Sequence, residues 1–202
     1  QSGFIADLGY ETYQKILSEA VKELKNEEFK ELYADEIRKG NDLSGDTFVD
    51  DCALESDLQM SFSESYVPSS SERMLLYREL YSLERDEDVE VFRSRMKDRF
   101  GEIPPEGEEL IRVVALRRLG KHLGAEKIFL KAGRMSLYFV KEEDSPYFQS
   151  KAFGQCIQYM TMNMHRCQLR EVKERRSMLI KDVHSVKEAV EILSYIVDLS
   201  GE

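Results

Sequence analysis

One segment of the chain, residues 105–123, limits the possible folds more than any other. Pro104 and Pro105 can occupy the first turn of a helix, and apolar residues follow over much of the helix circumference. Cationic residues occupy the rest of its surface, so only that part can face solvent. We therefore expect this helix at the centre of a domain. The apolar positions are Leu110, Ile111, Val113, Val114, Ala115, Leu116, Leu119 and Leu123, and the cations are Arg112, Arg117, Arg118 and Lys121.

Two helices are predicted upstream of this segment. Ser69 and Glu72 have capping-box spacing after Pro68, and the helix that follows them is amphipathic. The second helix starts in the acidic residues 85–90, which suit the positive end of a helix dipole, and Gly101 suits its stop. The apolar positions are Met74, Leu75, Tyr77, Leu80 and Tyr81 in the first helix and Val89, Phe92, Met96 and Phe100 in the second.

Strict alternation of apolar and polar residues over residues 52–62 predicts the clearest strand of the chain, with one buried face. Ser56 is the one polar residue on its apolar side. Residues 126–142 predict a β-hairpin that turns at Ala132-Gly133, and residues 165–183 predict two short strands around a charged turn.

Two more helices complete the pattern. Ser145 and Pro146 look like an N-cap followed by a first-turn proline, and Ser185 and Glu188 form another capping-box pair. Together these elements predict an α+β fold, a small and largely antiparallel sheet packed with several helices. The apolar positions of these helices are Tyr147, Phe148, Phe153, Ile157 and Met160, and Val186, Ala189, Val190, Leu193, Ile196 and Val197.

The first quarter of the chain has a different pattern of apolar and charged residues. Residues 8–24 have helical spacing of apolar side chains, so we expect a helical N-terminal extension. The charged, weakly patterned residues 25–51 are interpreted as a partly helical linker, with a domain boundary near residue 48. The absence of an initiator Met suggests that the sequence is a piece of a longer chain.

Composition limits the partners and the compartment. The net charge of −10 makes free nucleic acid a poor default partner and favours a basic protein surface. Three cysteines are too few for a disulfide framework and fit a reducing cytoplasm. No apolar run approaches the ~20 residues of a membrane-spanning helix, and the N-terminus does not resemble a secretory signal.

No catalytic or metal-binding motif in the sequence is complete. The segment "ALRRLGKHL" fails as a phosphate loop, because Ala115 and His122 stand where Gly and Ser or Thr are needed. Cys156, His165 and Cys167 lack a fourth zinc ligand, so core cysteines and a strand-edge histidine are favoured. No local signature links the histidines to a nucleophile, and the sequence predicts no catalytic, cofactor-binding or metal residue.

Two charged runs have two interpretations each. Glu84, Asp86, Glu87, Asp88 and Glu90 are first a solvated helix start, and second one flank of an acidic docking face that reaches Asp98. The basic set Arg166, Arg170, Lys173, Arg175 and Arg176 is first a solvated hairpin and second a contact for a DNA phosphate backbone.

Parts of the chain resemble bacterial transcription-repair coupling factors. "QSGFIADLGYETYQKILSEAV" is similar to the segment that closes their translocase module. "YVPSSSERMLLYREL", "KDRFGEIPPEGEELIRVVALRRLGKHLGAEKI" and the hairpin after them resemble their C-terminal regulatory (TRCF) domain. The resemblance divides the chain into residues 1–47, the tail of the translocase module and a linker, and residues 48–202, the regulatory domain.

The resemblance implies a non-catalytic, autoinhibitory interaction domain without a cofactor of its own. The parent would be a cytoplasmic, ATP- and Mg-dependent translocase on double-stranded DNA, which removes stalled RNA polymerase and recruits UvrA for nucleotide excision repair. In the resting parent this domain would pack on an N-terminal UvrB-like module, cover the UvrA-docking surface and restrain the motor. The second hypothesis is an accessory DNA-contacting module that uses the basic residues 166–176.

The resemblance also assigns a role to Asp98, which lies in the last turn of a predicted helix, where an acid is unfavourable by roughly 0.3–1 kcal/mol. In the family, acids at this helix end contact arginines of the UvrB-like module, and the matching positions here are Asp98 and Arg95. Asp98 keeps the acid, whereas Arg95 departs from it. A local ion pair of Asp98 with Arg95, Lys97 or Arg99 is the alternative.

Overall fold

The structure is a computed structural model that describes residues 30–39 and 44–200. The chain divides into two compact units, residues 1–42 and 43–202. In the first unit, residues 30–38 are helical, within the segment interpreted as a linker, and the helix predicted at 8–24 lies outside the described residues.

The second unit begins at residue 43, whereas the sequence placed the boundary near residue 48. The short 3-10 helix η1 (Gly45–Thr47) explains the difference, because it packs into this unit. A Cβ atom on Gly45 would lie 2.1 Å from the backbone nitrogen of Gly124, so only glycine permits this approach. Phe48 then packs edge-on against Tyr147, with ring centroids 5.8 Å apart.

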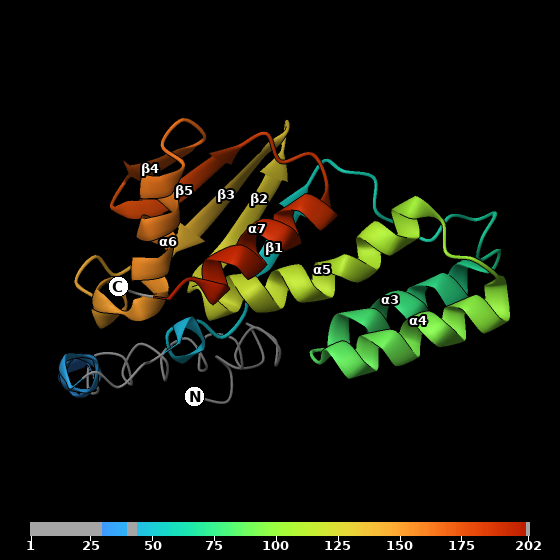
Figure 1. Ribbon diagram of the computed structural model, residues 1–202. Coiled ribbons are helices and arrows are strands. Elements are labelled where there is room, and N and C mark those ends of the chain that lie inside the picture. The colour runs from blue at the N-terminus through green and yellow to red at the C-terminus, as the bar shows by residue number, and fades with distance from the viewer. Residues whose placement is uncertain (1–29, 40–43, 201–202) are drawn as a thin grey trace, which may run out of the picture. The chain divides into compact units, whose positions relative to one another are not determined.

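Five strands of the second unit form one sheet, in the order β1-β2-β3-β5-β4 (Figure 1). Only β1 pairs in parallel, with β2, and the remaining pairs are antiparallel. The fold class predicted from the sequence, α+β with a largely antiparallel sheet, is confirmed. The strands are β1 (Ala53–Ser56), β2 (Ala125–Lys131), β3 (Arg134–Phe139), β4 (Cys167–Val172) and β5 (Arg175–Lys181).

The long strand predicted over residues 52–62 is wrong in its length, because β1 ends at Ser56. The Ser56 hydroxyl donates to the carbonyl oxygen of Leu130 at 2.8 Å and accepts from the backbone N–H of Leu58 at 3.0 Å. This local turn competes with the ladder, and β2 itself ends one residue later at Lys131. The apolar side chains beyond Ser56 still point inward, down to the buried Phe62.

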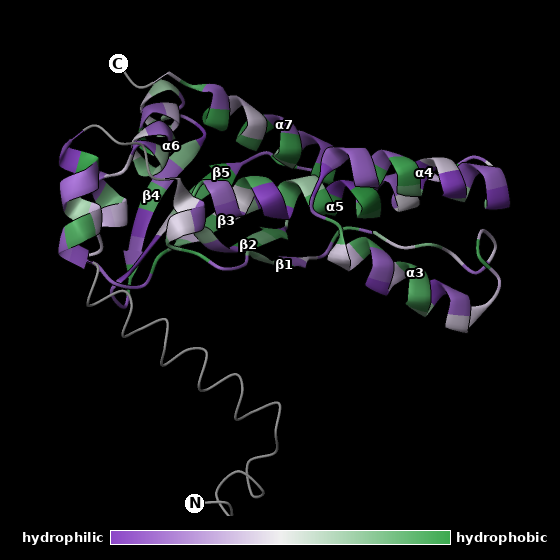
Figure 2. Cartoon of the chain, turned by 90° about the horizontal axis from the view of Figure 1, so that it is seen from below, coloured by the Kyte–Doolittle hydropathy of each residue, from purple (hydrophilic) through white to green (hydrophobic). Residues whose placement is uncertain are grey.

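Three helices, α5 (Pro105–His122), α6 (Lys151–Met162) and α7 (Val186–Asp198), lie on one face of the sheet (Figures 1 and 2). Helix α5 packs against β2, α7 and the helix pair α3–α4, so its predicted central place is confirmed. The pair consists of α3 (Ser70–Ser82) and α4 (Asp86–Phe100), which pack against α5 beside the sheet (Figure 1).

Several helix caps and turns form at the residues that the sequence predicts. The Ser69 and Ser185 side chains accept from the backbone N–H groups of Glu72 and Glu188, as the capping-box spacing predicts. Gly101 ends α4 with φ 86°, and Ala132 and Gly133 turn the β2–β3 hairpin with φ values of 53° and 70°.

Two helix predictions need correction. Met74, Leu75 and Tyr81 of α3 are 54%, 63% and 67% exposed, because α3 contacts the core only through the stripe of Leu76, Tyr77 and Leu80. The helix predicted from residue 146 is the 3-10 helix η2 (Pro146–Gln149) followed by a new cap at Ser150, which starts α6. That break sets Tyr147 in the core, with its hydroxyl donating to the carbonyl of Leu123.

None of the helices in residues 30–39 and 44–200 has the length and apolarity needed to cross a bilayer.

Candidate interdomain interface

The α3–α4 pair has its own small core, which fixes the orientation of both helices. Phe92 is 1% exposed and stacks on Phe62 at a centroid distance of 6.2 Å. Phe62 also stacks on Tyr77 of α3 at 5.6 Å. Since these rings join α3, α4 and the segment before α3, the charged groups at the two ends of α4 are held on a rigid support.

Two ion pairs cross from α3 to the C-terminal half of α4. Glu79 pairs with Arg95, and Glu72 pairs with Arg99. The two guanidinium groups also lie near aromatic rings of their own helix, Arg95 5.8 Å from the Phe92 centroid and Arg99 5.0 Å from that of Phe100. Both arginines are therefore bound within the pair, although at such exposed sites each ion pair contributes only ~0–1 kcal/mol.

Asp98 lies on the same helical turn and is left out of these contacts. Its side chain is exposed, and no ion pair or hydrogen bond joins its carboxylate to any residue that the structure describes. The local alternative for Asp98, a pair with Arg95, Lys97 or Arg99, is not formed here. The carboxylate is available to a cation outside the described residues.

The backbone around Asp98 is already satisfied. The N–H of Gly101 donates to the carbonyl of Lys97 at 3.0 Å, and the Tyr66 hydroxyl donates to the carbonyl of Gly101 at 2.8 Å. Burial raises the pKa of the Tyr66 hydroxyl, so the hydroxyl stays a neutral donor at the end of α4. Asp98 is therefore not needed to close this helix end, and its charge opposes the dipole there.

Most of the acidic residues at the N-terminal end of α4 lie within ion-pair distance of an arginine of the domain. Asp86 pairs with Arg118 of α5, Glu90 pairs with Arg93, and Arg85 lies 3.8 Å from Glu87 and 3.5 Å from Asp88. Glu84 is exposed and forms no ion pair with the described residues. Asp86 and Asp98 are twelve residues apart, about 18 Å along the helix, and Glu90, the nearest member of this flank, lies about 12 Å along the helix from Asp98.

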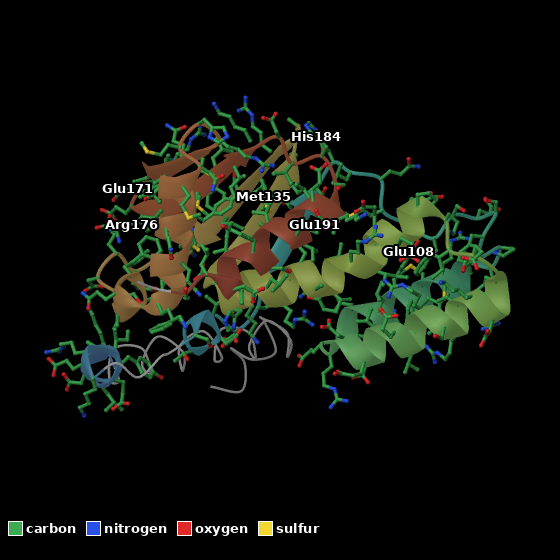
Figure 3. All side chains as sticks on the ribbon, in the orientation of Figure 1. Glu108, Met135, Glu171, Arg176, His184 and Glu191 are labelled. Atoms are coloured by element: carbon green, nitrogen blue, oxygen red, sulfur yellow. The ribbon has the colours of Figure 1, made fainter. Side chains whose placement is uncertain are left out.

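The basic residues 166–176 do not form one surface. Arg166 donates to the carbonyls of Lys181 and Asp182, both at 2.8 Å, and Arg175 pairs with Glu126 at 2.7 Å. Arg176 lies on the helix side of the sheet, 4.3 Å from the Phe148 ring centroid (Figure 3). Sequence proximity therefore groups cations that the strands separate onto opposite faces.

The cysteines have the properties of core residues. All three are free and buried, and burial raises the pKa of Cys52 and of Cys156 to about 12. A thiol with such a pKa is protonated at neutral pH and is a poor nucleophile. Within residues 30–39 and 44–200, no three His, Cys, Asp or Glu side chains come together as a metal-binding group.

Comparison with known proteins decides the family. Residues 56–150 match the family model described as the TRCF domain. The chain carries a TRCF domain. The matched range contains α3, α4 and α5, and hence Asp98 and its surroundings, and it ends before α6.

The TRCF domain has relatives among curated proteins named transcription-repair-coupling factor. The protein of Rickettsia bellii is 30% identical over 145 residues, which are 71% of this chain and 12% of that protein. The protein of Buchnera aphidicola subsp. Baizongia pistaciae is 28% identical over 128 residues, 63% of this chain and 17% of that protein. The chain thus spans less than a fifth of the length of these relatives.

A solved structure confirms the fold of the TRCF domain. It is the crystal structure of the C-terminal domain of a transcription-repair coupling factor, and its similarity has a TM-score of 0.52 at 12% sequence identity. The similarity covers 72% of this chain and 94% of that one. The two chains therefore share the α+β arrangement, while the residues on it differ.

The partners of Arg95 and Arg99 in this TRCF domain were not predicted from the sequence. Glu72 and Glu79 lie seven residues apart and so project from one face of α3. Arg95 and Arg99 are likewise four residues apart on one face of α4. Matching these two periodicities would have predicted the ion pairs that leave Asp98 as the acid of α4 without an ion pair among the described residues.

Proposed function

We propose that this chain is the non-catalytic, autoinhibitory interaction domain of a transcription-repair coupling factor. Its docking point is the C-terminal end of α4, and its partner in cis is a basic surface of the parent's N-terminal UvrB-like module. The observation that carries the proposal is Asp98, an exposed carboxylate without an ion pair in the described part of the chain, beside two arginines that α3 has already bound.

Electrostatics explains why such a group suits a reversible docking contact between this domain and the UvrB-like module, which we call the latch. An acid in the last turn of a helix is unfavourable in the free domain, and a docked arginine removes that penalty. Exposed ion pairs are weak, so the gain is small and falls with ionic strength. A small gain suffices, because latched and released states need differ by only a few kcal/mol.

Arg95 fits the same proposal once its partner is included. A free arginine beside Asp98 would repel a basic partner, but Glu79 binds Arg95 and compensates its charge. Asp98 is then the acid of α4 itself that such a surface meets at this end. Glu79 thus acts as a positioning residue for the docking point.

In the parent, the latch would act on a larger activity. The parent would be a cytoplasmic ATP- and Mg-dependent translocase on double-stranded DNA that displaces stalled RNA polymerase and recruits UvrA. Docking of this domain on the UvrB-like module would cover the UvrA surface and restrain the motor until polymerase is engaged. The domain itself would need no cofactor for this role.

Titration of the 202-residue chain with the isolated UvrB-like module tests the proposal. We expect weak association that salt abolishes, and a severalfold loss of affinity for Asp98→Asn. Asp198→Asn is a matched control, because Asp198 is also an exposed acid in the last turn of a helix, α7. In the full-length parent, Asp98→Asn should raise UvrA binding and ATP turnover, and Asp198→Asn should change neither.

The proposal fails if Asp98→Asn and Asp198→Asn behave alike in both assays. It also fails if the two modules do not associate even at low salt while the intact parent is still autoinhibited.

A further inference from the structure

The face of the sheet opposite the helices carries a second charged surface, which the Asp98 proposal does not use. Helices α5, α6 and α7 cover one face, where alternate residues such as Met135 are fully buried (Figure 3). In residues 44–200 no helix covers the other face (Figures 1 and 2). We call this second side the outer face, and it consists of the alternate residues of the five strands.

Strand register arranges the outer face in rows. Lys131, Arg134 and Lys181 are direct neighbours across β2, β3 and β5, in the first row. Phe129, Ser136, Leu179 and Gln168 follow in the next row, and then Lys127, Tyr138, Ser177 and Arg170. Arg175 and Val172 pair at the far end. Cations therefore surround two aromatic rings on the central strands.

The row of three cations is unfavourable by itself. Like charges directly opposite one another on neighbouring strands destabilise a sheet. Glu55 accepts from Lys131 at 3.1 Å and from Lys127 at 3.2 Å, so it is shared between two cations. Arg134 and Lys181 form no ion pair with the residues that the structure describes. Asp57, at the same end, accepts from the backbone N–H of Ala132 at 2.9 Å.

The carboxylates of the outer face do not balance its cations. Glu55 serves two lysines, and Glu126 binds Arg175 at 2.7 Å. Against these two acids and Asp57, whose carboxylate accepts from a backbone N–H, stand Lys127, Lys131, Arg134, Arg170, Arg175 and Lys181. The excess is positive, although the whole chain has a net charge of −10. A local positive surface on an acidic protein is suited to an anionic ligand.

The aromatic residues of the outer face indicate which class of anionic ligand it would bind. Phe129 and Tyr138 are half-buried neighbours, with ring centroids 5.1 Å apart. Cations lie over both rings, the Lys127 ammonium 4.6 Å from the Phe129 centroid and the Arg175 guanidinium 5.7 Å from that of Tyr138. Exposed cation–π contacts are weak, so a nucleobase can displace the cation and leave it to bind a phosphate.

We propose that the outer face binds single-stranded nucleic acid, with bases on Phe129 and Tyr138 and phosphates on Arg134, Lys181 and Arg170. Aromatic side chains on the central strands of an open sheet are a recognised platform for unstacked bases. A duplex offers no free base faces to these rings. An acidic peptide would use the cations but gain nothing specific from Phe129.

Fluorescence anisotropy of the 202-residue chain with labelled oligothymidylate tests the proposal. We expect saturable binding with a dissociation constant on the order of 1–100 μM at low salt. Arg134→Gln with Lys181→Gln should weaken binding about tenfold and lower the salt slope by about 1.4, since each single-strand phosphate contact contributes about 0.7. Thermal unfolding of this variant should show no loss of stability, because repulsion within the row is relieved.

Lys97→Gln with Lys187→Gln is the matched control. It removes the same charge from exposed positions on α4 and α7, and it should leave binding unchanged within about twofold. Phe129→Leu keeps an apolar side chain but removes the stacking surface. It should weaken oligothymidylate binding roughly tenfold, without weakening the binding of inorganic polyphosphate, which has no bases.

Four outcomes would overturn the proposal. They are the absence of saturable binding to oligothymidylate, equal weakening by the control variant, no effect of Phe129→Leu, and binding of a duplex or of polyglutamate as tight as that of the single strand. Asp98 is unchanged in all these variants, so failure here leaves the docking proposal standing, and failure of the docking proposal leaves this one standing.

Discussion

The acids at the two ends of α4 differ in their effect on the helix dipole and in their ion pairing. At the N-terminal end, Asp86, Glu87 and Asp88 favour the helix dipole, and each lies beside an arginine. At the C-terminal end, Asp98 opposes the dipole and has no ion pair with a described residue, while Arg95 and Arg99 bind acids of α3. One helix thus shows acids that its own fold satisfies and one acid that it does not.

The contrast teaches that the number of acids does not locate a docking site. The run from Glu84 to Glu90 is the denser one, but most of its charge is compensated within the domain. Asp98 is a single charge that a cationic partner could bind without breaking an existing pair among the described residues, and unlike Glu84 it opposes the helix dipole. An interface is better sought where a group is unfavourable in the free protein.

The largest expected effect tests whether either charged end holds α4 in place. Phe92 lies midway along the helix and is 1% exposed, so Phe92→Ala should lower the free energy of unfolding by about 3–5 kcal/mol. Val91→Ala on the exposed side of the same turn should change it by less than about 0.5 kcal/mol. Chemical denaturation measures both, and a loss below about 1 kcal/mol for Phe92→Ala would contradict a helix anchored by its middle.

The second effect concerns how α4 ends beside Asp98. Gly101 has φ 86°, and a Cβ there would meet no atom within 4 Å, so Gly101→Ala suffers only from its backbone conformation. We expect a loss of roughly 1–2 kcal/mol in the free energy of unfolding. Gly154→Ala in α6 is the opposite case, also with free space but without a positive φ, and should stabilise by about 0.5–1 kcal/mol. Equal signs for the two would refute this account.

Local chemistry of this kind is what the sequence predicts well. The caps at Ser69 and Ser185, the stop at Gly101 and the turn at Ala132-Gly133 each depend on residues within a few positions of one another. Such interactions form in the same way whatever the rest of the chain does. They were sufficient to place most helices and strands and to predict the α+β class.

Features that depend on distant neighbours were predicted poorly. β1 is short because its partner β2 ends at Lys131, and α3 exposes Met74 and Leu75 because nothing in residues 44–200 covers that side. The cations of the outer face were missed for the same reason. Lys131, Arg134 and Lys181 become neighbours only through register, whereas the basic residues 166–176 were grouped by proximity in the chain.

A smaller effect distinguishes the two ends of α4 by its sign. Asp88→Asn removes an acid that favours the dipole and lies 3.5 Å from Arg85, so it should destabilise by about 0.3–1 kcal/mol. Asp98→Asn removes an acid that opposes the dipole, so it should stabilise by a similar, small amount. Thermal unfolding at low salt measures both shifts, and high salt should reduce both. If both substitutions destabilise, Asp98 has a partner in the domain.

The smallest effect tests the contact that keeps Arg95 from repelling a basic partner. A double-mutant cycle with Glu79→Gln and Arg95→Gln should give a coupling energy of about 0.2–1 kcal/mol, as for other exposed pairs. The two single variants should change the affinity for a basic module in opposite directions. Glu79→Gln frees a cation beside Asp98 and should weaken association with a basic module, whereas Arg95→Gln removes that cation and should strengthen it. Titration at low salt measures both changes. If the two substitutions shift affinity in the same direction, charge at this end of α4 does not govern docking, and the contrast between the ends of the helix concerns stability alone.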